Sequence, residues 1–226
     1  SNDGGGIYTD DSTVRVLNST ITNNTAVGRA GGIGLLPDNI GDERLIVRNS
    51  IVARNTDTST APDILAPGDP ANDLTVDYSL IGNTTGSGVT ASTGTGNLLN
   101  VNPMLGPLSD NGGPTLTRAL LAGSPAINAG DPAFAGPPNT DQRGSGFVRV
   151  SGSQIDIGAF ERQPEQPSLV VTTAVDTIDD FDLVTSLREA INFANSRSDA
   201  ATITFDSNVF SGGADSLIRL SGMELE

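Results

Sequence analysis

Four amino-acid types are missing from this chain of 226 residues: histidine, cysteine, lysine and tryptophan. Without histidine and cysteine, the chain has no Ser-His-Asp or Cys-His triad, no zinc site of the imidazole or thiolate kind, and no disulfide framework. Without lysine, Schiff-base chemistry and lysine isopeptide cross-links are excluded as well. Acid and base chemistry would therefore depend on carboxylates and arginine alone.

Positive charge and long apolar runs are also scarce. The 27 acidic residues outnumber the 12 basic ones, all arginine, and give a net charge of −15. Phosphate binding needs clustered positive charge, so we expect no nucleic-acid partner. No apolar run reaches the roughly 18 residues of a membrane-spanning helix, so we expect no direct membrane insertion. The aromatic fraction of 4% argues against an aromatic platform for carbohydrate stacking.

What the chain does contain is an internal repeat. Each copy has a Gly-Ile or Asp-Ile step, two apolar residues at alternating positions, an Asn-Ser or Tyr-Ser pair and an Asn-Thr pair. The first two Asn-Ser pairs start at Asn18 and Asn49, a spacing of 31 (49 minus 18), and a weaker third copy contains Tyr78 and Ser79. A period of roughly 20 to 50 residues is typical of stacked supersecondary units.

The short alternating apolar runs, separated by Gly, Asn, Asp and Thr, predict strands and turns. Such a unit buries its apolar side chains only by stacking on its neighbours, so the sequence predicts an all-β fold, a right-handed parallel β-helix or solenoid. Asn24, Asn55 and Asn83 would form a hydrogen-bonded ladder at a corner with left-handed φ, or else merely mark surface turns. The expected core comprises Ile7, Val14, Val16, Ile21, Ile33, Leu45, Val47, Ile51, Leu74, Val76 and Leu80.

Changes in composition divide the chain into four segments. Residues 1–96 carry the coils, and residues 84–96 are expected to be a long loop leaving the stack. Residues 97–162 are expected to form a C-terminal β cap, and residues 163–167 a Pro-rich linker. Residues 168–226 start a new module, with expected strands at residues 169–171, 203–205 and 217–220 and a single helix.

The expected helix, residues 187–196, begins after Ser186, which forms a capping box with Glu189. Leu187, Ile191 and Ala194 fall on one helical face. We expect this face to cover the open end of a β-helix, because repeat proteins need capping units at their ends.

Four sequence blocks carry a resemblance to a known family. They are P-L-x-D-N-G-G-P-T, G-S-P-A-I-x-A-G, D-Q-R-G and D-I-G-A-x-E, and they begin at Pro107, Gly123, Asp141 and Asp156. In this order they resemble the C-terminal end of bacterial surface proteins with a choice-of-anchor Q domain. Residues 168–226 resemble the CSLREA domain, the N-terminal start of the same pectin-lyase-like β-helix proteins, with Thr185 where the name motif has Cys. The resemblance implies an extracellular, cell-surface location.

Residues 97–162, which resemble the end of such a domain, precede residues 168–226, which resemble its start. This order is the inverse of the order within one complete domain. We therefore expect a window cut from a tandem array, and a circularly permuted domain is the less favoured alternative. Unpaired strand edges at both ends predict head-to-tail association with other copies or adjacent repeats. The expected assembly residues are Gly4, Gly5, Gly6, Ile7 and Tyr8 at one end, and Leu220, Met223 and Leu225 at the other.

Acidic residues supply the candidates for catalysis. A polysaccharide hydrolase on this scaffold needs an acid and a base about 5 to 9.5 Å apart. The candidates on the stack lie in loops and do not recur at one strand position, so we expect solvated loop acids, no catalytic residues and no enzyme. These candidates are Asp10, Asp11, Asp38, Asp42 and Glu43.

Two further groups of charged residues stand out. Asp141 and Arg143 are expected to form a buried structural pair. An acidic cluster before the helix offers oxygen ligands for a calcium ion, against a solvated turn as the default, and no other cofactor is expected. This cluster contains Asp176, Asp179, Asp180 and Asp182.

The sequence as a whole predicts a structural or adhesive segment of a large extracellular bacterial repeat protein, which assembles head-to-tail into a rod or filament. One alternative is a polysaccharide-active hydrolase or lyase on the same scaffold. Another is a glycan-binding adhesin module. Paired acids facing one groove would favour the enzyme, and exposed aromatic residues on one face of the stack would favour glycan binding.

Overall fold

The computed structural model describes residues 4–10, 12–36, 44–58, 62–66, 74–179, 181–182, 184–212 and 217–220. The chain forms two compact units, Ser1–Arg162 and Gln163–Glu226, and each is described by itself.

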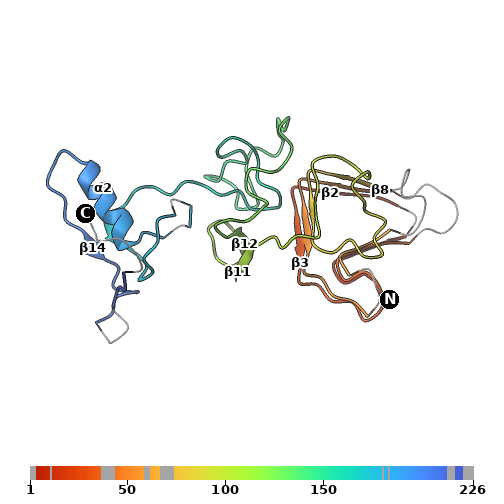
Figure 1. Ribbon diagram of the computed structural model, residues 1–226, viewed down its shortest axis with the longest axis horizontal. Coiled ribbons are helices and arrows are strands. Elements are labelled where there is room, and N and C mark those ends of the chain that lie inside the picture. Colours follow the sequence, from red (N-terminus) through yellow and green to blue (C-terminus); the bar gives the residue numbers. More distant parts are fainter. Residues whose placement is uncertain are drawn as a thin grey trace. The chain divides into compact units, whose positions relative to one another are not determined.

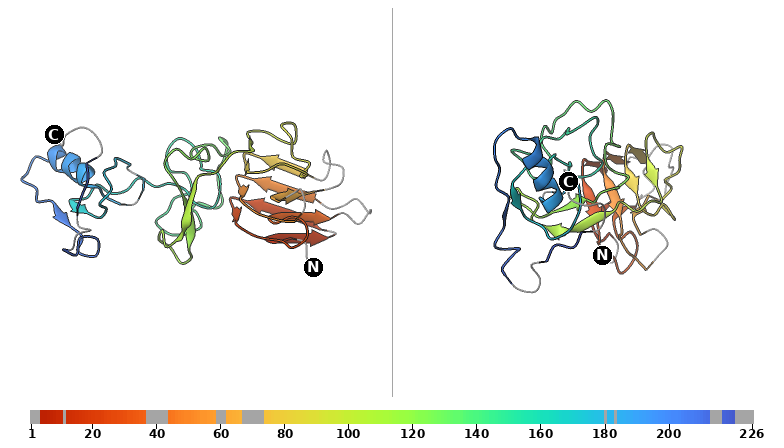
Figure 2. Two further views of the ribbon diagram at one scale, coloured as in Figure 1. Left: turned by 60° about the horizontal axis from the view of Figure 1, so that its bottom comes forward. Right: turned by 60° about the vertical axis from the view of Figure 1, so that its left-hand side comes forward.

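The first unit contains three sheets in which all strands run parallel (Figures 1 and 2). Each turn of the chain, or coil, adds one strand to each sheet. The first sheet contains β1 (Ile7–Asp10), β4 (Ile33–Leu36) and β7 (Ile64–Leu65). The second contains β2 (Thr13–Leu17), β5 (Arg44–Arg48) and β8 (Leu74–Asp77). The third contains β3 (Thr20–Thr22), β6 (Ile51–Ala53), β9 (Leu80–Ile81) and β10 (Leu98–Leu99).

Stacked parallel sheets of this kind make a β-solenoid and fit a right-handed parallel β-helix, so the predicted fold class is confirmed. Val14 pairs with Leu45, and Leu45 pairs with Leu74. The repeat seen in the sequence is therefore the coil of the solenoid.

Apolar side chains from successive coils form one buried inner cluster. Val16, Ile33, Leu45, Val47, Leu74 and Val76 are buried in it as predicted, and Ile7, Val14 and Ile21 of the first coil pack against it while partly exposed. Ile51 and Leu80 are also fully buried as predicted, but they belong to a second cluster, on the outer face of the third sheet. Ile21 pairs with Val52, so Val52 and Ile81 occupy the inner positions on the third sheet.

Left-handed residues recur at the corner between the second and third sheets. The φ angles are 49° at Asn18, 46° at Asn49 and 47° at Tyr78. Asn and Gly tolerate this conformation better than other residues. At the next corner, after the third sheet, φ is 57° at Asn23 and 60° at Arg54, so the left-handed residues stand one position before the predicted Asn24 and Asn55.

Side-chain ladders join the coils along two corners. Asn24 Nδ2 donates to Asn55 Oδ1 at 3.0 Å, which confirms the first rung of the predicted asparagine ladder. Asn55 Nδ2 then donates to Asp63 Oδ1 at 2.9 Å, so Asp63 and not Asn83 is the next member. In a second ladder, the N–H of Ser19 donates to Ser50 Oγ and the N–H of Ser50 donates to Ser79 Oγ. These bonds satisfy backbone donors at the turns, where strand pairing ends.

Residues 84–96 stack against the third coil and do not leave the solenoid. Val89 is buried in the inner cluster together with Val76 and Ile81. The N–H of Tyr78 donates to the carbonyl of Thr95 at 2.8 Å, and the N–H of Thr95 donates to Asp77 Oδ1 at 3.1 Å. The segment leads into β10, which pairs with β9, so it belongs to a short further coil.

The following segment packs on the outer face of the third sheet. It contains an antiparallel pair, β11 (Leu105–Ser109) and β12 (Thr117–Leu120). Its apolar residues Leu105, Leu120 and Ile157 cluster with Ile51 and Leu80. This cover explains why both faces of β6 and β9 are buried.

The second unit contains a parallel pair, β13 (Val170–Val171) and β14 (Thr204–Phe205), and the helix α2 (Leu187–Ser196). The capping box predicted for Ser186 and Glu189 is confirmed, as are the bounds of the helix. Ala190 is buried, and α2 contacts β13. Residues 217–220, which were expected to form a strand, have no regular secondary structure.

Candidate functional site

The outer side of the first coil is open. β1, β2 and β3 are each the outermost strand of their sheet, with no further strand paired to them in the described part of the chain. Ser12 accepts from Arg44, and Asn18 donates to Arg48, so these residues bond to the second coil. Backbone groups of alternate residues point to opposite sides of a strand. The N–H groups of Thr13, Arg15 and Leu17 therefore point away from the stack.

The residues predicted for assembly at this end lie on the open coil. Gly4, Gly5 and Gly6 donate backbone hydrogen bonds to the carbonyls of Arg29, Ala30 and Gly31, in that order. Ile7 is partly buried, and Tyr8 is 40% exposed. Of the residues predicted at the other end, Leu220 is 48% exposed, and Met223 and Leu225 lie outside the described residues.

Asp141 and Arg143 form the buried pair that the sequence predicts. Arg143 Nη2 lies 2.7 Å from Asp141 Oδ2, and both side chains are fully buried. The guanidinium carbon lies 3.9 Å from the ring centre of Phe147 and 3.8 Å from that of Phe160. A planar cation between two aromatic rings is a favourable arrangement.

The pair and Asp156 together join the four sequence blocks in space. Arg143 donates to the carbonyl of Asn111 in the first block and to that of Glu161 in the fourth. Asp156 Oδ1 of the fourth block accepts from the N–H of Asn128 in the second at 2.7 Å. The blocks are therefore contact points of one buried polar network, although they are far apart in sequence.

Glu161 is the most perturbed group of this network. Its two carboxylate oxygens accept from the N–H groups of Ser151 at 3.0 Å and Asp156 at 2.8 Å. Burial and the charge of Asp156 outweigh these bonds and raise the pKa of Glu161 to about 8. The pKa of Asp156 is also raised, chiefly by burial.

The acidic cluster proposed for calcium is engaged in other contacts. Asp176 binds Arg188 through two hydrogen bonds, of 2.9 Å to Nε and 3.0 Å to Nη2. Asp179 and Asp182 accept from nearby backbone N–H groups, and Asp180 lies outside the described residues. Among the residues that the structure describes, no three acidic side chains come together as a metal site would require.

The candidate catalytic acids fall largely outside the described residues. This holds for Asp11, Asp38, Asp42, Glu43 and the side chain of Asp10. The alternative of a polysaccharide-active enzyme on these residues stays a prediction.

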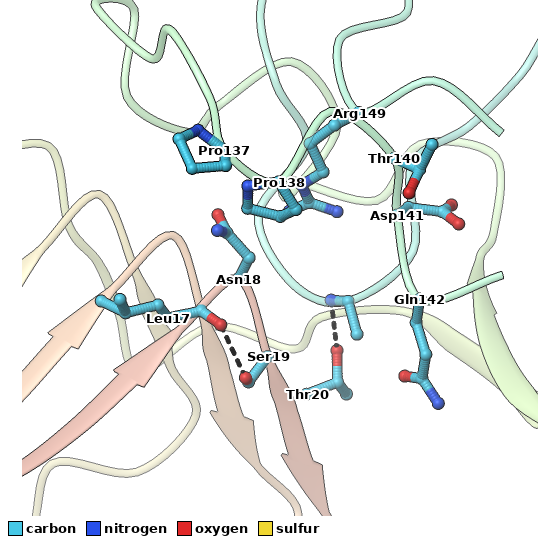
Figure 3. A pocket seen from close by; sticks show the side chains of 11 residues that line it. Leu17, Asn18, Ser19, Thr20, Pro137, Pro138, Thr140, Asp141, Gln142 and Arg149 are labelled. Atoms are coloured by element: carbon cyan, nitrogen blue, oxygen red, sulfur yellow. Dashed lines mark hydrogen bonds between the residues drawn. The ribbon is translucent and has the colours of Figure 1, made fainter. Parts of the chain in front are cut away.

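A pocket of about 530 Å³ lies between the first coil and the segment that covers the third sheet (Figure 3). The coil contributes residues 17–20, and the covering segment contributes Pro137, Pro138, Thr140, Gln142 and Arg149 among others. The N–H of Ala159 donates to Thr20 Oγ1 at 3.0 Å, and Ser19 Oγ donates to the carbonyl of Leu17 at 2.7 Å. Both hydrogen bonds join residues that line the pocket.

Arg149 lines this pocket while only 1% exposed. Its Nη2 atom donates to the carbonyls of Asp156 and Gly158. Burial lowers the pKa of Arg149, although Glu161, Asp141 and Asp156 act in the opposite direction. Sequence reasoning missed this residue, because a single arginine in the apolar run Phe147 to Val150 has no motif around it.

Comparisons with family models, with curated proteins and with solved structures found no match. Of the helical segments that the structure describes, none has the length and hydropathy of a membrane span.

Proposed function

We propose that the chain is a structural segment of an extracellular repeat protein, in which coils stack end to end into a rod or filament. The observation that carries this proposal is the open first coil, whose three strands are all outermost in their sheets within the described part of the chain. The cell-surface location rests on the resemblance of the four sequence blocks.

The chemistry of the open coil favours a strand-bearing partner. Its outward N–H and C=O groups need hydrogen-bond partners, and added parallel strands would supply them. Ile7, Val14 and Ile21 are partly exposed there and would become buried. The partner is a further coil, either from an adjacent repeat or from the opposite end of another copy. Contact between two different surfaces is heterologous and produces an open filament unless it closes a ring.

Sedimentation velocity over a range of concentrations tests association between copies. We expect concentration-dependent growth for the parent chain and its loss in Arg15→Pro, which removes one outward N–H from the edge strand β2. Arg15→Val is the matched control, because it removes the same side chain and retains the N–H. A parent chain that stays monomeric throughout, or a proline variant that associates equally well, would contradict assembly between copies.

Glycan binding is the second candidate, because the pocket of about 530 Å³ beside the first coil has the size of a small-molecule site. No comparable observation favours an enzyme.

A further inference from the structure

A groove runs along residues 17–23, on the open side of the first coil. Besides the pocket of Figure 3, a second pocket of about 330 Å³ lies between β3 and the β11–β12 hairpin. Thr20, Gln142 and Ala159 line both pockets, so the two are neighbours and form one groove, here named the β3 groove. Among the described residues, none of the second coil lines it. The β3 groove therefore lies where a further strand of the third sheet would be added.

The β3 groove exposes apolar side chains. Leu17 lines one end, Leu108 and Leu116 line the other, and each of the three is about half exposed. Exposed apolar residues that gather in one depression mark interaction surfaces. The β11–β12 hairpin, which carries Leu108, also packs on Ile51 and Leu80 of the neighbouring strands. The groove therefore continues an interface that already exists within the chain.

The backbone of β3 offers a definite set of groups for pairing. The N–H of Ile51 donates to the carbonyl of Ser19, so Ser19 and Ile21 turn their backbone groups toward β6. Thr20 and Thr22, at the alternate positions, turn theirs to the open side. In a parallel pair, a residue whose groups face the neighbour lies opposite one whose groups face away, as Ile51 lies opposite Thr20. An added strand would therefore place such a residue opposite Ile21.

The second unit has a free strand edge of the matching kind. In β14, the N–H groups of Thr204 and Asp206 donate across to β13. The backbone groups of Ile203 and Phe205, at the alternate positions, point to the other side, where β14 has no further strand in the described part of the chain. The outer edge of β13 is partly used, because the N–H of Thr172 donates to the segment before α2. β14 is therefore the edge available for pairing.

We propose that the β3 groove of one copy binds β14 of a second copy in parallel, so that the third sheet of one chain continues into the second unit of the next. Both partners contribute strand edges, and both expose apolar side chains that pairing would bury. The two surfaces are different, so each copy carries one of each and the contact repeats from copy to copy. The inference rests on the proposed function, since it names the partner of the open coil.

The pairing rule allows Phe205 to lie opposite Ile21, with both side chains on the inner face of the sheet. This register brings the exposed ring of Phe205 over the open end of the inner cluster, where Ile21 is partly exposed. It also places Asp206 opposite Thr22, in the part of the groove that Arg118 lines, so that opposite charges meet.

Disulfide cross-linking tests this register, because the chain has no cysteine of its own. Opposed residues of neighbouring strands have Cα atoms about 4.8 Å apart, within the range that a disulfide spans. A Thr22→Cys chain is mixed with an Asp206→Cys chain under mild oxidation, and mass spectrometry should show a heterodimer in excess of both homodimers. In the control, an Arg15→Cys chain, with its cysteine on the edge strand β2, replaces the Thr22→Cys chain and should give at least about fivefold less heterodimer.

The two outcomes of cross-linking separate this inference from the proposed function. A heterodimer no more abundant than in the Arg15→Cys control would overturn the pairing of β14 with β3. If the parent chain still associates in sedimentation velocity, the proposed function stands and only this choice of partner fails. A parent chain that neither associates nor cross-links contradicts both.

Leu116→Gln tests the part of the groove formed by the hairpin. We expect association in sedimentation velocity to weaken about tenfold, because burial of a leucine side chain contributes at least that much to binding. Leu121→Gln is the matched control, since Leu121 is 47% exposed against 52% for Leu116 and lines neither pocket. Equal association of the two variants would show that the partner does not occupy the β3 groove.

Discussion

Arg143 shows how one charged residue can become part of a protein core. Its guanidinium has a carboxylate partner in Asp141, carbonyl partners on Asn111 and Glu161, and an aromatic ring on each face. A buried charge is tolerated when it is paired and its donors are satisfied. Arginine suits this position because its planar guanidinium donates several hydrogen bonds and stacks on aromatic rings at the same time. The compact ammonium group of lysine could not replace it.

Arg143→Met is expected to destabilise the first unit by about 3–5 kcal/mol, because it leaves the Asp141 carboxylate buried without a counter-charge. Urea unfolding measures the loss. Arg48→Met is the control, since the Arg48 side chain is 56% exposed in its ion pair with Asp77. A surface pair of this kind contributes up to about 1 kcal/mol. Similar losses for the two variants would contradict the structural role of the buried pair.

Glu161 predicts a dependence of stability on pH. The ordinary pKa of this carboxyl is 4.5, and in the folded chain it is about 8. Between these values the folded state binds more protons than the unfolded state, so the free energy of unfolding falls as the pH rises. The loss of stability that comes from ionising buried Glu161 is absent below a pH of about 4.5 and complete above a pH of about 8. The raised pKa values of Asp63 and Asp156 act in the same direction.

Urea unfolding between these two pH values checks this prediction. Glu161→Gln should flatten the decline of stability with pH, because the titrating group is gone. Glu165→Gln, the same substitution in the other compact unit, should leave the slope of the first unit unchanged. If Glu161→Gln keeps the slope of the parent chain, the pH dependence comes from other carboxylates and the prediction is wrong.

At the scale of single elements, the direction of a side chain depends on what covers the strand. β6 and β9 have adjacent apolar residues, Ile51 with Val52 and Leu80 with Ile81. Period-two alternation does not specify which member of such a pair faces inward. The covering segment buries the outer members, so both faces of the strand are apolar. Helix α2 was predictable because its capping box and apolar face are both local.

Val47→Ala is expected to destabilise the solenoid by about 1–4 kcal/mol, because it removes two methyl groups from the middle of the inner cluster. The coils on either side are hydrogen-bonded and cannot easily close over the cavity. Urea unfolding measures the change. Val27→Ala is the control, because Val27 is 74% exposed. An equal response of the two variants would mean that the inner cluster does not support the fold.

At the scale of the whole molecule, the chain contains two compact units, with the boundary in the sequence between Arg162 and Gln163. The first has parallel sheets with one open side. The second has only a two-stranded parallel pair beside its helix. Within the described residues both units have strands without a further partner at one side, and such edges in natural proteins are paired, covered or charged. The association experiment with Arg15→Pro tests whether the edge of the first coil pairs with another copy of the chain.

The sequence by itself determined the coil period, the capped helix and the pairing of Asp141 with Arg143, because each depends on residues close in the chain or on a repeated pattern. Only the tertiary structure decided the outward direction of Ile51, the place of residues 84–96 on the stack, and the meeting of Asn18 with Arg149 in one pocket. Asn18 and Arg149 lie more than half the chain apart. Local pattern carries no information about such contacts, which arise when separate segments compete to cover the same apolar surface.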